Sequence, residues 1–272
     1  MSPPNKRTAT LIGSTAILMW GLLALFTTLT GKVPPFLLAA LAFGTATALI
    51  AAKWLVRREN VITHLKQPLG AWAVGVIGLF GYHFFYFMAL RNAPPVEAGL
   101  IAYMWPLLIV LFSALLPGER LRWFHLAGTL AGLAGAGLLI TGGQGLAGFK
   151  SEFTLGYVMA VCCALTWSSY SVINRRFGHV PTDTVGGFCA ATAVLAALCH
   201  MAFETTVWPA DTGEWIAVLG LGLLPLGLAF FAWDHGTKHG DIRVLGAFAY
   251  AAPLLSTVIL ISFGKGEATW AV

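Results

Sequence analysis

Nine long apolar runs follow one another along this 272-residue sequence, and they restrict its fold more than any other feature. A helix needs roughly 20 apolar residues to cross a bilayer. The polar breaks between the runs are too short to hold a soluble domain. Because unpaired backbone groups cannot face lipid, the runs predict an all-α integral membrane protein. They lie at residues 8–30, 34–56, 68–90, 95–116, 121–141, 154–174, 184–203, 213–234 and 242–263.

The composition excludes several classes of protein. Charged residues make up 10% of the chain, against roughly 25% in soluble domains, and the mean hydropathy is +0.79. An ordinary cytosolic enzyme, a disordered protein and a nucleic-acid-binding protein are therefore excluded, and the lipid bilayer is the expected surrounding. The first run is too long for a cleaved signal peptide. All four cysteines lie in apolar runs, which indicates buried thiols rather than a disulfide framework: Cys162, Cys163, Cys189 and Cys199.

The basic residues predict the orientation of the chain. Cytoplasmic loops of membrane proteins carry an excess of lysine and arginine. With the N-terminus in the cytoplasm, only Lys32, Arg91, Lys150 and Lys265 lie outside. The other twelve lie inside: Lys6, Arg7, Lys53, Arg57, Arg58, Lys66, Arg120, Arg122, Arg175, Arg176, Lys238 and Arg243.

An internal repeat divides the chain into residues 1–147 and 148–272. A shift of 147 residues places Trp20 on Trp167 and the run 99–108 on 246–255, with six identities. Five spans are an odd number, so the second repeat must enter the membrane inverted, as in many secondary transporters. Glu119 precedes a complete fifth span, whereas its counterpart Glu267 precedes five residues. The repeat therefore predicts ten helices, with the tenth missing or incomplete because the sequence stops short of the natural C-terminus.

Three tryptophans near span centres mark the expected interior of the bundle. Trp20, Trp105 and Trp167 carry indole N–H groups that need hydrogen-bond partners in an apolar medium. We expect them to face the interior, and bulky packing is the alternative interpretation. The other seven lie at span ends, which is typical of interface residues: Trp54, Trp72, Trp123, Trp208, Trp215, Trp233 and Trp270.

His83 is the one ionisable side chain near the centre of any predicted span, and Tyr82 precedes it. Ionisable residues inside a membrane are functional candidates; a neutral histidine that bonds a neighbouring helix is the alternative. His235 and His239 have helical spacing but no third ligand, so no metal site is expected. The remaining charges are interpreted as solvated or interfacial: Arg91, Glu97, Glu119, Arg122, Glu204, Asp211, Glu214, Asp234 and Asp241.

Two prolines predict matched kinks in the fourth and ninth spans. Each proline removes one helical hydrogen bond and frees a carbonyl that needs a partner. One helical stripe joins Gly99, Tyr103 and Pro106, and the repeat reproduces it as Gly246, Tyr250 and Pro253. A tyrosine and a kink beside small residues form a plausible cavity wall; close helix packing is the alternative.

The predicted span centres contain no carboxylate and no lysine or arginine that could hold an anion. Neither a phosphate-binding loop nor a nucleophile elbow is present, so nothing indicates ATP-driven pumping or hydrolysis. Aromatic rings, freed carbonyls and hydroxyls remain, the last from Thr166, Ser168, Ser169 and Ser256. Such a lining fits a zwitterionic aromatic amino acid, whose ring stacks and whose ammonium contacts aromatic faces.

Three features carry a resemblance to a known family: the stretch 116–121 (Leu-Pro-Gly-Glu-Arg-Leu), the repeated Ala-Tyr-x-x-Pro-Leu-Leu and the glycine-rich fifth span. Together with the inverted repeat, they make the chain similar to EamA-type members of the drug/metabolite transporter superfamily, and the central aromatic residues to the aromatic amino acid exporters among them. The resemblance implies a bacterial inner-membrane exporter of aromatic amino acids and similar small metabolites. It works by alternating access, without cofactor or metal. The expected substrate-binding residues are Trp20, Tyr82, His83, Tyr103, Trp105, Trp167 and Tyr250.

This resemblance also implies a midplane cavity between the two halves, walled by spans one, three, four, six, eight and nine. The bends at Gly99, Pro106, Gly246 and Pro253 are expected to let one half rock against the other. The partner is a small molecule rather than a nucleic acid, and a monomer is the working expectation. Three alternatives stay open: an exporter of the same fold for drugs, nucleobases or thiol metabolites, a membrane-embedded enzyme, or a channel.

Overall fold

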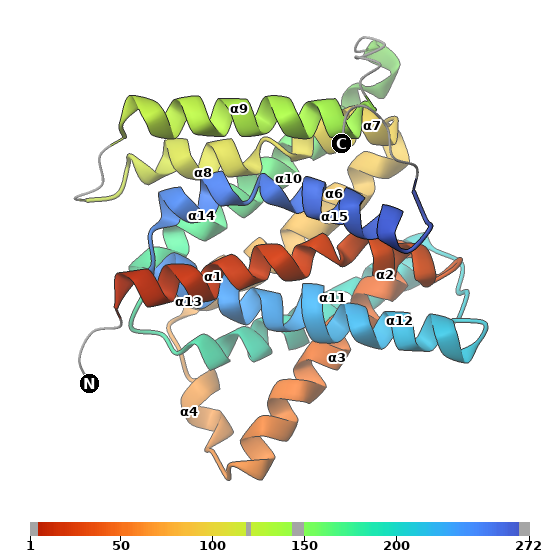
Figure 1. Ribbon diagram of the computed structural model, residues 1–272. Helices are drawn as coiled ribbons and strands as arrows, with labels where there is room; N and C mark the ends of the chain where they lie inside the picture. The colour runs from red at the N-terminus through yellow and green to blue at the C-terminus, as the bar shows by residue number, and fades with distance from the viewer. Residues whose placement is uncertain (1–4, 118–120, 143–149, 267–272) are drawn as a thin grey trace.

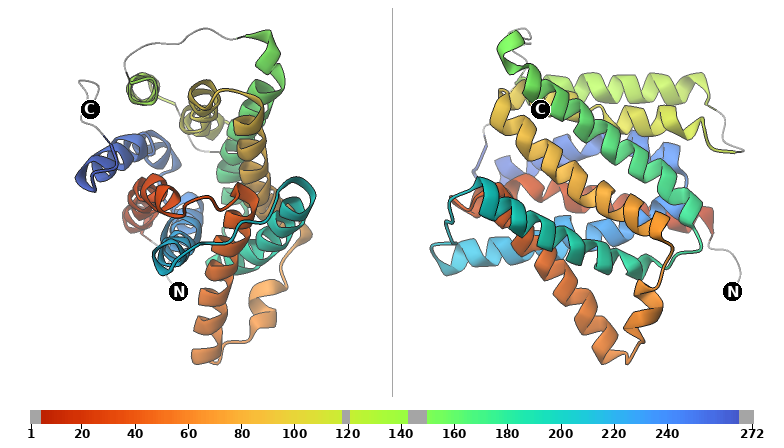
Figure 2. Two further views of the ribbon diagram at one scale, coloured as in Figure 1. Left: turned by 90° about the vertical axis from the view of Figure 1, so that its right-hand side faces the viewer. Right: turned by 180° about the vertical axis from the view of Figure 1, so that it is seen from behind.

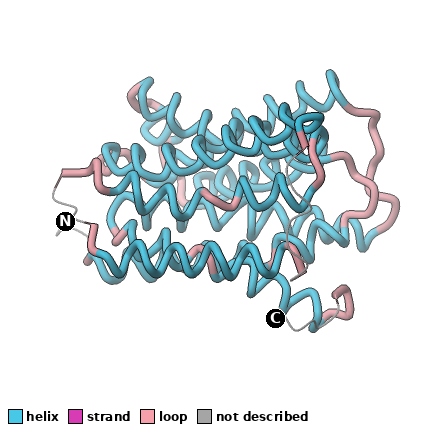
Figure 3. The backbone as a smooth tube through the Cα atoms, turned by 90° about the horizontal axis from the view of Figure 1, so that it is seen from above, coloured by secondary structure: helices cyan, strands magenta, loops and turns pink. Residues whose placement is uncertain are grey.

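The computed structural model describes residues 5–117, 121–142 and 150–266, and all regular structure within these ranges is helical (Figures 1 and 3). In these ranges nine helical segments are long and apolar enough to cross a membrane, which confirms the predicted spans. The predicted tenth helix, Glu119, Glu267 and Trp270 lie outside the described residues. The nine segments are Lys6–Leu29, Pro35–Val56, Leu69–Asn92, Pro95–Ser113, Trp123–Ile140, Ser151–Phe177, Thr182–Phe203, Thr212–His239 and Ile242–Ser262.

Most spans consist of more than one helix. The first repeat contains α1 (Lys6–Gly21), α2 (Leu23–Leu29), α3 (Pro35–Val56), α4 (Val61–Leu65), α5 (Leu69–Val76), the π-helix η1 (Ile77–Gly81), α6 (Tyr82–Asn92), α7 (Pro95–Ala102), α8 (Trp105–Ser113) and α9 (Trp123–Ile140). The second contains η2 (Ser151–Phe153), α10 (Thr154–Ile173), η3 (Asn174–Phe177), η4 (Thr182–Thr184), α11 (Val185–Phe203), α12 (Thr212–Leu223), the π-helix η5 (Leu224–Leu228), α13 (Ala229–His239), α14 (Ile242–Phe248) and α15 (Ala251–Ser262). We call the end of the bundle where α1 begins and α13 ends the N-terminal face, and the other end the opposite face.

The backbone reproduces the repeat found in the sequence. The fourth span breaks between α7 and α8 at Tyr103, and the ninth breaks between α14 and α15 at Tyr250, which is the equivalent position. Both breaks precede a proline in the first turn of the next helix, where its missing N–H costs nothing. The π-helices η1 and η5 also lie 147 residues apart. Single π-turns are rare and frequent at functional sites, so their matched positions are informative.

The two repeats interlace instead of forming separate bundles. Helix α1 packs along α13, α3 along α11, α6 along α10 and α8 against α14, so every one of these pairs joins the two repeats. Figure 2, in its left view, looks along the long helices, with α1, α13 and α15 on one side and α6 and α10 on the other. We call α6, α7, α8 and α10 the first mixed group, and α1, α13, α14 and α15 the second. The repeats are thus units of sequence, whereas the packing units draw on both.

Small residues allow the long pairs to approach closely. Gly13 of α1 meets Gly236 of α13, where an added Cβ on Gly236 would lie 2.5 Å from the Cα of Gly13. The repeat places Ala160 of α10 and Ala89 of α6 at the equivalent positions, and both are completely buried in one cluster. Small side chains therefore stand at both crossings, as is common where membrane helices pack.

Ionic contacts tie the pair α3–α11 at both ends. At the opposite face, the Glu204 carboxylate accepts hydrogen bonds from the backbone N–H groups of Phe36 (2.9 Å) and Leu37 (3.2 Å) and lies 2.9 Å from Nδ1 of His200. At the N-terminal face, Asp183 accepts from Lys53 and from the indole of Trp54. Glu204 was predicted to be solvated or interfacial; it does lie at the end of its span, but its side chain is only 4% exposed because it caps the start of α3. Trp54 is likewise buried beneath this contact.

Candidate functional site

Four tryptophans from four different spans meet in the middle of the bundle. The ring centroid of each lies between 5.0 and 6.3 Å from those of the other three, mostly edge to face. These are favourable separations for aromatic pairs. We call this set the tryptophan cluster: Trp20 of α1, Trp105 of α8, Trp167 of α10 and Trp233 of α13.

Trp233 corrects a prediction, since it had been assigned to the membrane interface. It is completely buried, and its indole N–H donates to Oγ of Ser171 at 3.0 Å. The eighth span runs to His239 instead of ending at 234, so Trp233 lies well inside it. The repeat held a usable signal, because the position equivalent to Trp233 is Tyr86, another aromatic residue.

Further rings extend the cluster. Tyr82 lies 5.2 Å from Trp167 between ring centroids, and His83 lies 5.1 Å from Tyr82. Tyr103 contacts the cluster at its edge, 6.4 Å from Trp105. Sequence reasoning missed three further aromatic residues that contact His83 or Trp167, because by type alone they look like ordinary packing residues: Phe43, Tyr170 and Phe230.

Tyr250 lies apart from the cluster. It is 7% exposed, packs beside Gly132 of α9, and its hydroxyl accepts a hydrogen bond from the backbone N–H of Leu107 at 3.1 Å. That N–H lies in the first turn of α8, where backbone N–H groups have no hydrogen-bond partner within their own helix. Tyr250 thus links α8 to the break before α15.

The two π-helices supply carbonyls to the rings. The indole N–H of Trp20 donates to the carbonyl of Pro225 in η5 at 3.1 Å. Nδ1 of His83 lies 2.7 Å from the carbonyl of Leu79 in η1. Since a carbonyl can only accept, Nδ1 carries the proton, and Nε2 of the neutral ring remains an acceptor.

Several polar atoms around the cluster have no protein partner. Within the described residues, no hydrogen bond is made by the indole N–H of Trp105 or Trp167, or by the hydroxyl of Tyr82 or Tyr103. Tyr82, His83 and Tyr103 are only half-buried, although they lie far from the ends of their spans. No side chain lies within 4 Å of a Cβ added at Gly99, one turn before Tyr103, whereas one added at Gly246 would lie 3.0 Å from Ile109 and Val110. These open polar atoms, on Tyr82, Tyr103 and Trp105 of the first repeat and on Trp167 of the second, are available to a ligand.

A buried ion pair closes the N-terminal face beneath the cluster. Asp234 accepts from Nζ of Lys238 (2.9 Å), from Asn174 (2.9 Å) and from the hydroxyl of Thr182 (2.8 Å). The two charged side chains are 0% and 1% exposed. The predictions of an interfacial Asp234 and of no buried lysine are therefore wrong. The polar partners come from η3 and η4, which the sequence pattern of α13 alone does not reveal.

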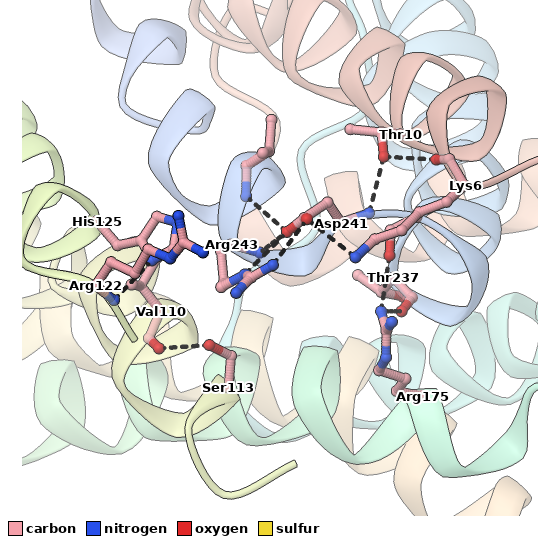
Figure 4. A network of polar contacts seen from close by, with 12 residues as sticks. Lys6, Thr10, Val110, Ser113, Arg122, His125, Arg175, Thr237, Asp241 and Arg243 are labelled. Atoms are coloured by element: carbon pink, nitrogen blue, oxygen red, sulfur yellow. Dashed lines mark hydrogen bonds and ion pairs between the residues drawn. The ribbon is translucent and has the colours of Figure 1, made fainter. Parts of the chain in front are cut away.

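A second polar network continues this closure to the surface (Figure 4). Asp241 accepts from Lys6 (3.0 Å) and Arg243 (3.1 Å), and its backbone N–H donates to Thr10 at 2.8 Å. Arg175 donates to the carbonyl of Gly240 at 2.8 Å. Burial raises the pKa of Asp241, but hydrogen bonds from Arg243 and Lys6 outweigh it and hold that pKa well below its ordinary value.

We expect Asp241→Asn to lower the free energy of unfolding by about 1 kcal/mol at neutral pH, because both ion pairs are partly exposed. A depressed pKa in the folded state stabilises the protein fully above the unfolded value of about 4. This contribution is lost only as the pH falls through the lower, folded value. The difference in melting temperature between wild type and Asp241→Asn should thus stay constant from about pH 5 to about pH 8. A difference that disappears within this range would contradict the assignment.

At the opposite face, the described residues keep only one equivalent of these contacts: Arg91, the counterpart of Lys238, donates to the carbonyl of Phe203 at 3.2 Å. The repeat relates Asn174 and Asp234 to Thr27 of α2 and Phe87 of α6. Thr27 is exposed, and its hydroxyl donates to Leu23 of its own helix. Between α2 and α6, the described residues form no hydrogen bond. The two faces of the bundle therefore differ in how tightly the mixed groups are joined.

One set of potential metal ligands lies at the N-terminal face. Glu59, His64 and Asp183 bring their ligand atoms within 4.8 Å of one another. The Lys53 ammonium contacts Asp183 and lies 4.0 Å from Glu59. The Lys53 ammonium thus offsets one of the two carboxylate charges and occupies part of this set.

Comparison with known proteins places the chain among transporters. The model of the EamA-like transporter family matches residues 7–141 and 154–271, one segment in each repeat. A relative named aromatic amino acid exporter YddG, from Ancylobacter novellus, is 56% identical over 260 residues, which cover 96% of this chain and 90% of the relative. The protein of the same name from Escherichia coli (strain K12) is 24% identical over 269 residues, covering 94% and 88%.

A solved crystal structure superposes with a TM-score of 0.92 at 54% identity, covering 98% of this chain and 92% of the other. The family model alone covers well over half of the chain, and the fold agrees throughout. The chain therefore belongs to the EamA-like transporter family.

Proposed function

We propose that this protein exports aromatic amino acids and similar small amphipathic metabolites through a cavity lined by the tryptophan cluster. The observation that carries the proposal is the meeting of four tryptophans from both repeats, with two indole N–H groups left without protein acceptors. The relatives named as aromatic amino acid exporters support the same substrate class.

The chemistry of the cluster fits both parts of such a substrate. An aromatic ring inserted among Trp20, Trp105 and Trp167 gains stacking contacts worth about 0.5–1.5 kcal/mol per pair. The free indole N–H groups can donate to the substrate carboxylate. Nε2 of His83 can accept from the ammonium, and the ring faces attract that charge by about 0.5–2 kcal/mol. The open indole N–H groups and Nε2 of His83 thus each have a counterpart on the substrate.

The difference between the two faces supports transport by alternating access. Asp234 and Arg175 join the mixed groups at the N-terminal face, whereas the described residues of α2 and α6 share no hydrogen bond at the opposite face. We assign this arrangement to the state in which the N-terminal face is closed. The twelve basic residues assigned to the N-terminal side favour a cytoplasmic N-terminal face in a bacterial inner membrane.

The moving parts are the two mixed groups instead of the sequence halves. The breaks before Pro106 and Pro253 lie within these groups, and η1 and η5 directly precede α6 and α13; all four provide places to bend. Because α3 and α11 are tied at both ends, they form the fixed contact about which the groups rock. The export step then exchanges closure at one face for closure at the other.

Counterflow in proteoliposomes tests the proposal. Vesicles loaded with unlabelled tryptophan should accumulate labelled tryptophan, and unlabelled phenylalanine and tyrosine should compete. Competition only by drugs, nucleobases or thiol metabolites would support the alternative exporter of the same fold. Chemically altered tryptophan would indicate an enzyme, and single-channel current steps a channel; either result contradicts the proposal.

A further inference from the structure

The ion pair Asp234–Lys238 is fully withdrawn from solvent and satisfied on every side. Besides their mutual contact, Asp234 holds Asn174 and Thr182, and Nζ of Lys238 donates to the carbonyl of Val180 at 3.1 Å. A buried ion pair contributes little to stability compared with apolar residues of similar size. Charged residues buried inside a membrane protein are therefore candidates for contact with the transported substrate.

Position connects this pair to the transport path. Asp234 follows Trp233 of the tryptophan cluster directly in the sequence. Ser171 of α10 accepts a hydrogen bond from Trp233, and Asn174, the first residue of η3 three positions later, donates one to Asp234. The ion pair thus begins where the aromatic cluster ends, on the side of the N-terminal face.

Opening of the N-terminal face must separate α13 from η3 and from the connection between α10 and α11. Asp234 then loses Asn174 and Thr182, and Lys238 loses Val180. Both charges stay on α13, one turn apart, and face the opened space. Water or the charged end of a substrate can then replace the lost hydrogen bonds, and a substrate group of opposite charge forms the stronger, charge-assisted bond.

We infer that Asp234 and Lys238 form the first recognition point for the charged end of the substrate when the N-terminal face opens. The inference rests on the proposed function. Asp234 accepts the substrate ammonium, and Lys238 donates to the substrate carboxylate. A zwitterion brings one group of each kind and replaces the partners lost on both side chains, whereas an amine or a carboxylate alone replaces only one. The pair therefore selects zwitterions before the cluster selects the ring.

Side-specific kinetics test this inference in oriented membrane vesicles. Asp234→Asn and Lys238→Gln are assayed with tryptophan, with tryptamine, which lacks the carboxylate, and with indole-3-propionate, which lacks the ammonium. For substrate at the N-terminal face, we expect each variant to raise the KM of tryptophan about tenfold or more, since hydrogen bonds to charged groups are strong. We expect Asp234→Asn to spare indole-3-propionate and Lys238→Gln to spare tryptamine. For substrate at the opposite face, the KM of tryptophan should stay within about twofold.

An exposed ion pair provides the matched controls. Lys150 and Glu152 lie 3.9 Å apart at the opposite face, with side chains 66% and 62% exposed. Lys150→Gln and Glu152→Gln should leave all KM values unchanged. Asp234→Glu and Lys238→Arg keep the charges and should recover most of the affinity; they also serve if a neutral variant does not fold.

Two results would overturn the inference. A purely structural pair changes kcat and thermal stability while raising the KM of all three compounds alike, or alike from both faces. A normal KM in both neutral variants would also reject it. Wild-type protein that does not transport tryptophan would instead reject the proposed function, so the two failures are distinguishable.

Discussion

We expect Trp105→Ala and Trp167→Ala each to reduce tryptophan counterflow by about 10- to 100-fold. Each substitution removes an aromatic face, worth about 0.5–1.5 kcal/mol per ring contact, and an open indole N–H, whose bond to a carboxylate is worth about 1.5–3 kcal/mol. A loss of 1.4 kcal/mol corresponds to about tenfold. We expect the reduction mainly in binding, measured as the concentration of tryptophan that half-saturates counterflow.

Trp123→Ala is the control for these variants. Trp123 begins α9, is 80% exposed and makes no ring contact with the cluster among the described residues. Its removal should leave counterflow unchanged. If Trp105→Ala and Trp167→Ala both transport tryptophan at the wild-type rate, the cluster is not the binding site.

We expect Gly236→Ala to lower the free energy of unfolding by about 3 kcal/mol, the upper end of the usual cost of overpacking. The added Cβ would lie 2.5 Å from the Cα of Gly13, and a backbone atom cannot rotate away as a side chain can. Helices α1 and α13 must therefore move apart along their whole contact. The effect is measured by heating each protein and using size-exclusion chromatography to determine the fraction that stays monodisperse.

The same substitution at Gly135 is the matched control. No atom outside its own helix lies within 4 Å of a Cβ added there, on the exposed side of α9. Alanine is the better helix former, so Gly135→Ala should leave stability unchanged or raise it by about 0.5–1 kcal/mol. Equal stability of the two variants would show that α1 and α13 do not depend on close approach.

The spans could be predicted because hydropathy is a local property of the sequence. The prediction of the eighth span failed at its end, since Asp234 was treated as a solvated charge. In the structure the helix continues because Lys238, four residues later, and the distant Asn174 and Thr182 neutralise and satisfy that carboxylate. Burial of a charge depends on partners that no window of local sequence contains.

The ring cluster of the candidate site could be predicted only where the chemistry of one residue is conspicuous. Trp20, Trp105, Trp167, Tyr82 and His83 stood out as polar rings within apolar spans, and the structure brings them together. Phe230 and Trp233 could not be distinguished from packing and interface residues by type alone. The carbonyls of Leu79 and Pro225 lie in the two π-helices, and no sequence pattern predicted these helices or their hydrogen bonds to the rings.

The pairing of helices was equally invisible in the sequence. The repeat led to an expectation of two halves side by side, yet α1 packs on α13 and α6 on α10. Helix partners depend on which faces fit. The sequence shows this fit only in the small residues at matched positions of the two repeats: Gly13 with Ala160, and Ala89 with Gly236.

A structure determined with tryptophan bound tests the binding site most directly. We expect density for the substrate indole among the rings of Trp20, Trp105 and Trp167, with its ammonium within hydrogen-bonding distance of Nε2 of His83. Tryptophan bound away from these rings, or a cluster that stays closed in saturating tryptophan while transport proceeds, would contradict it.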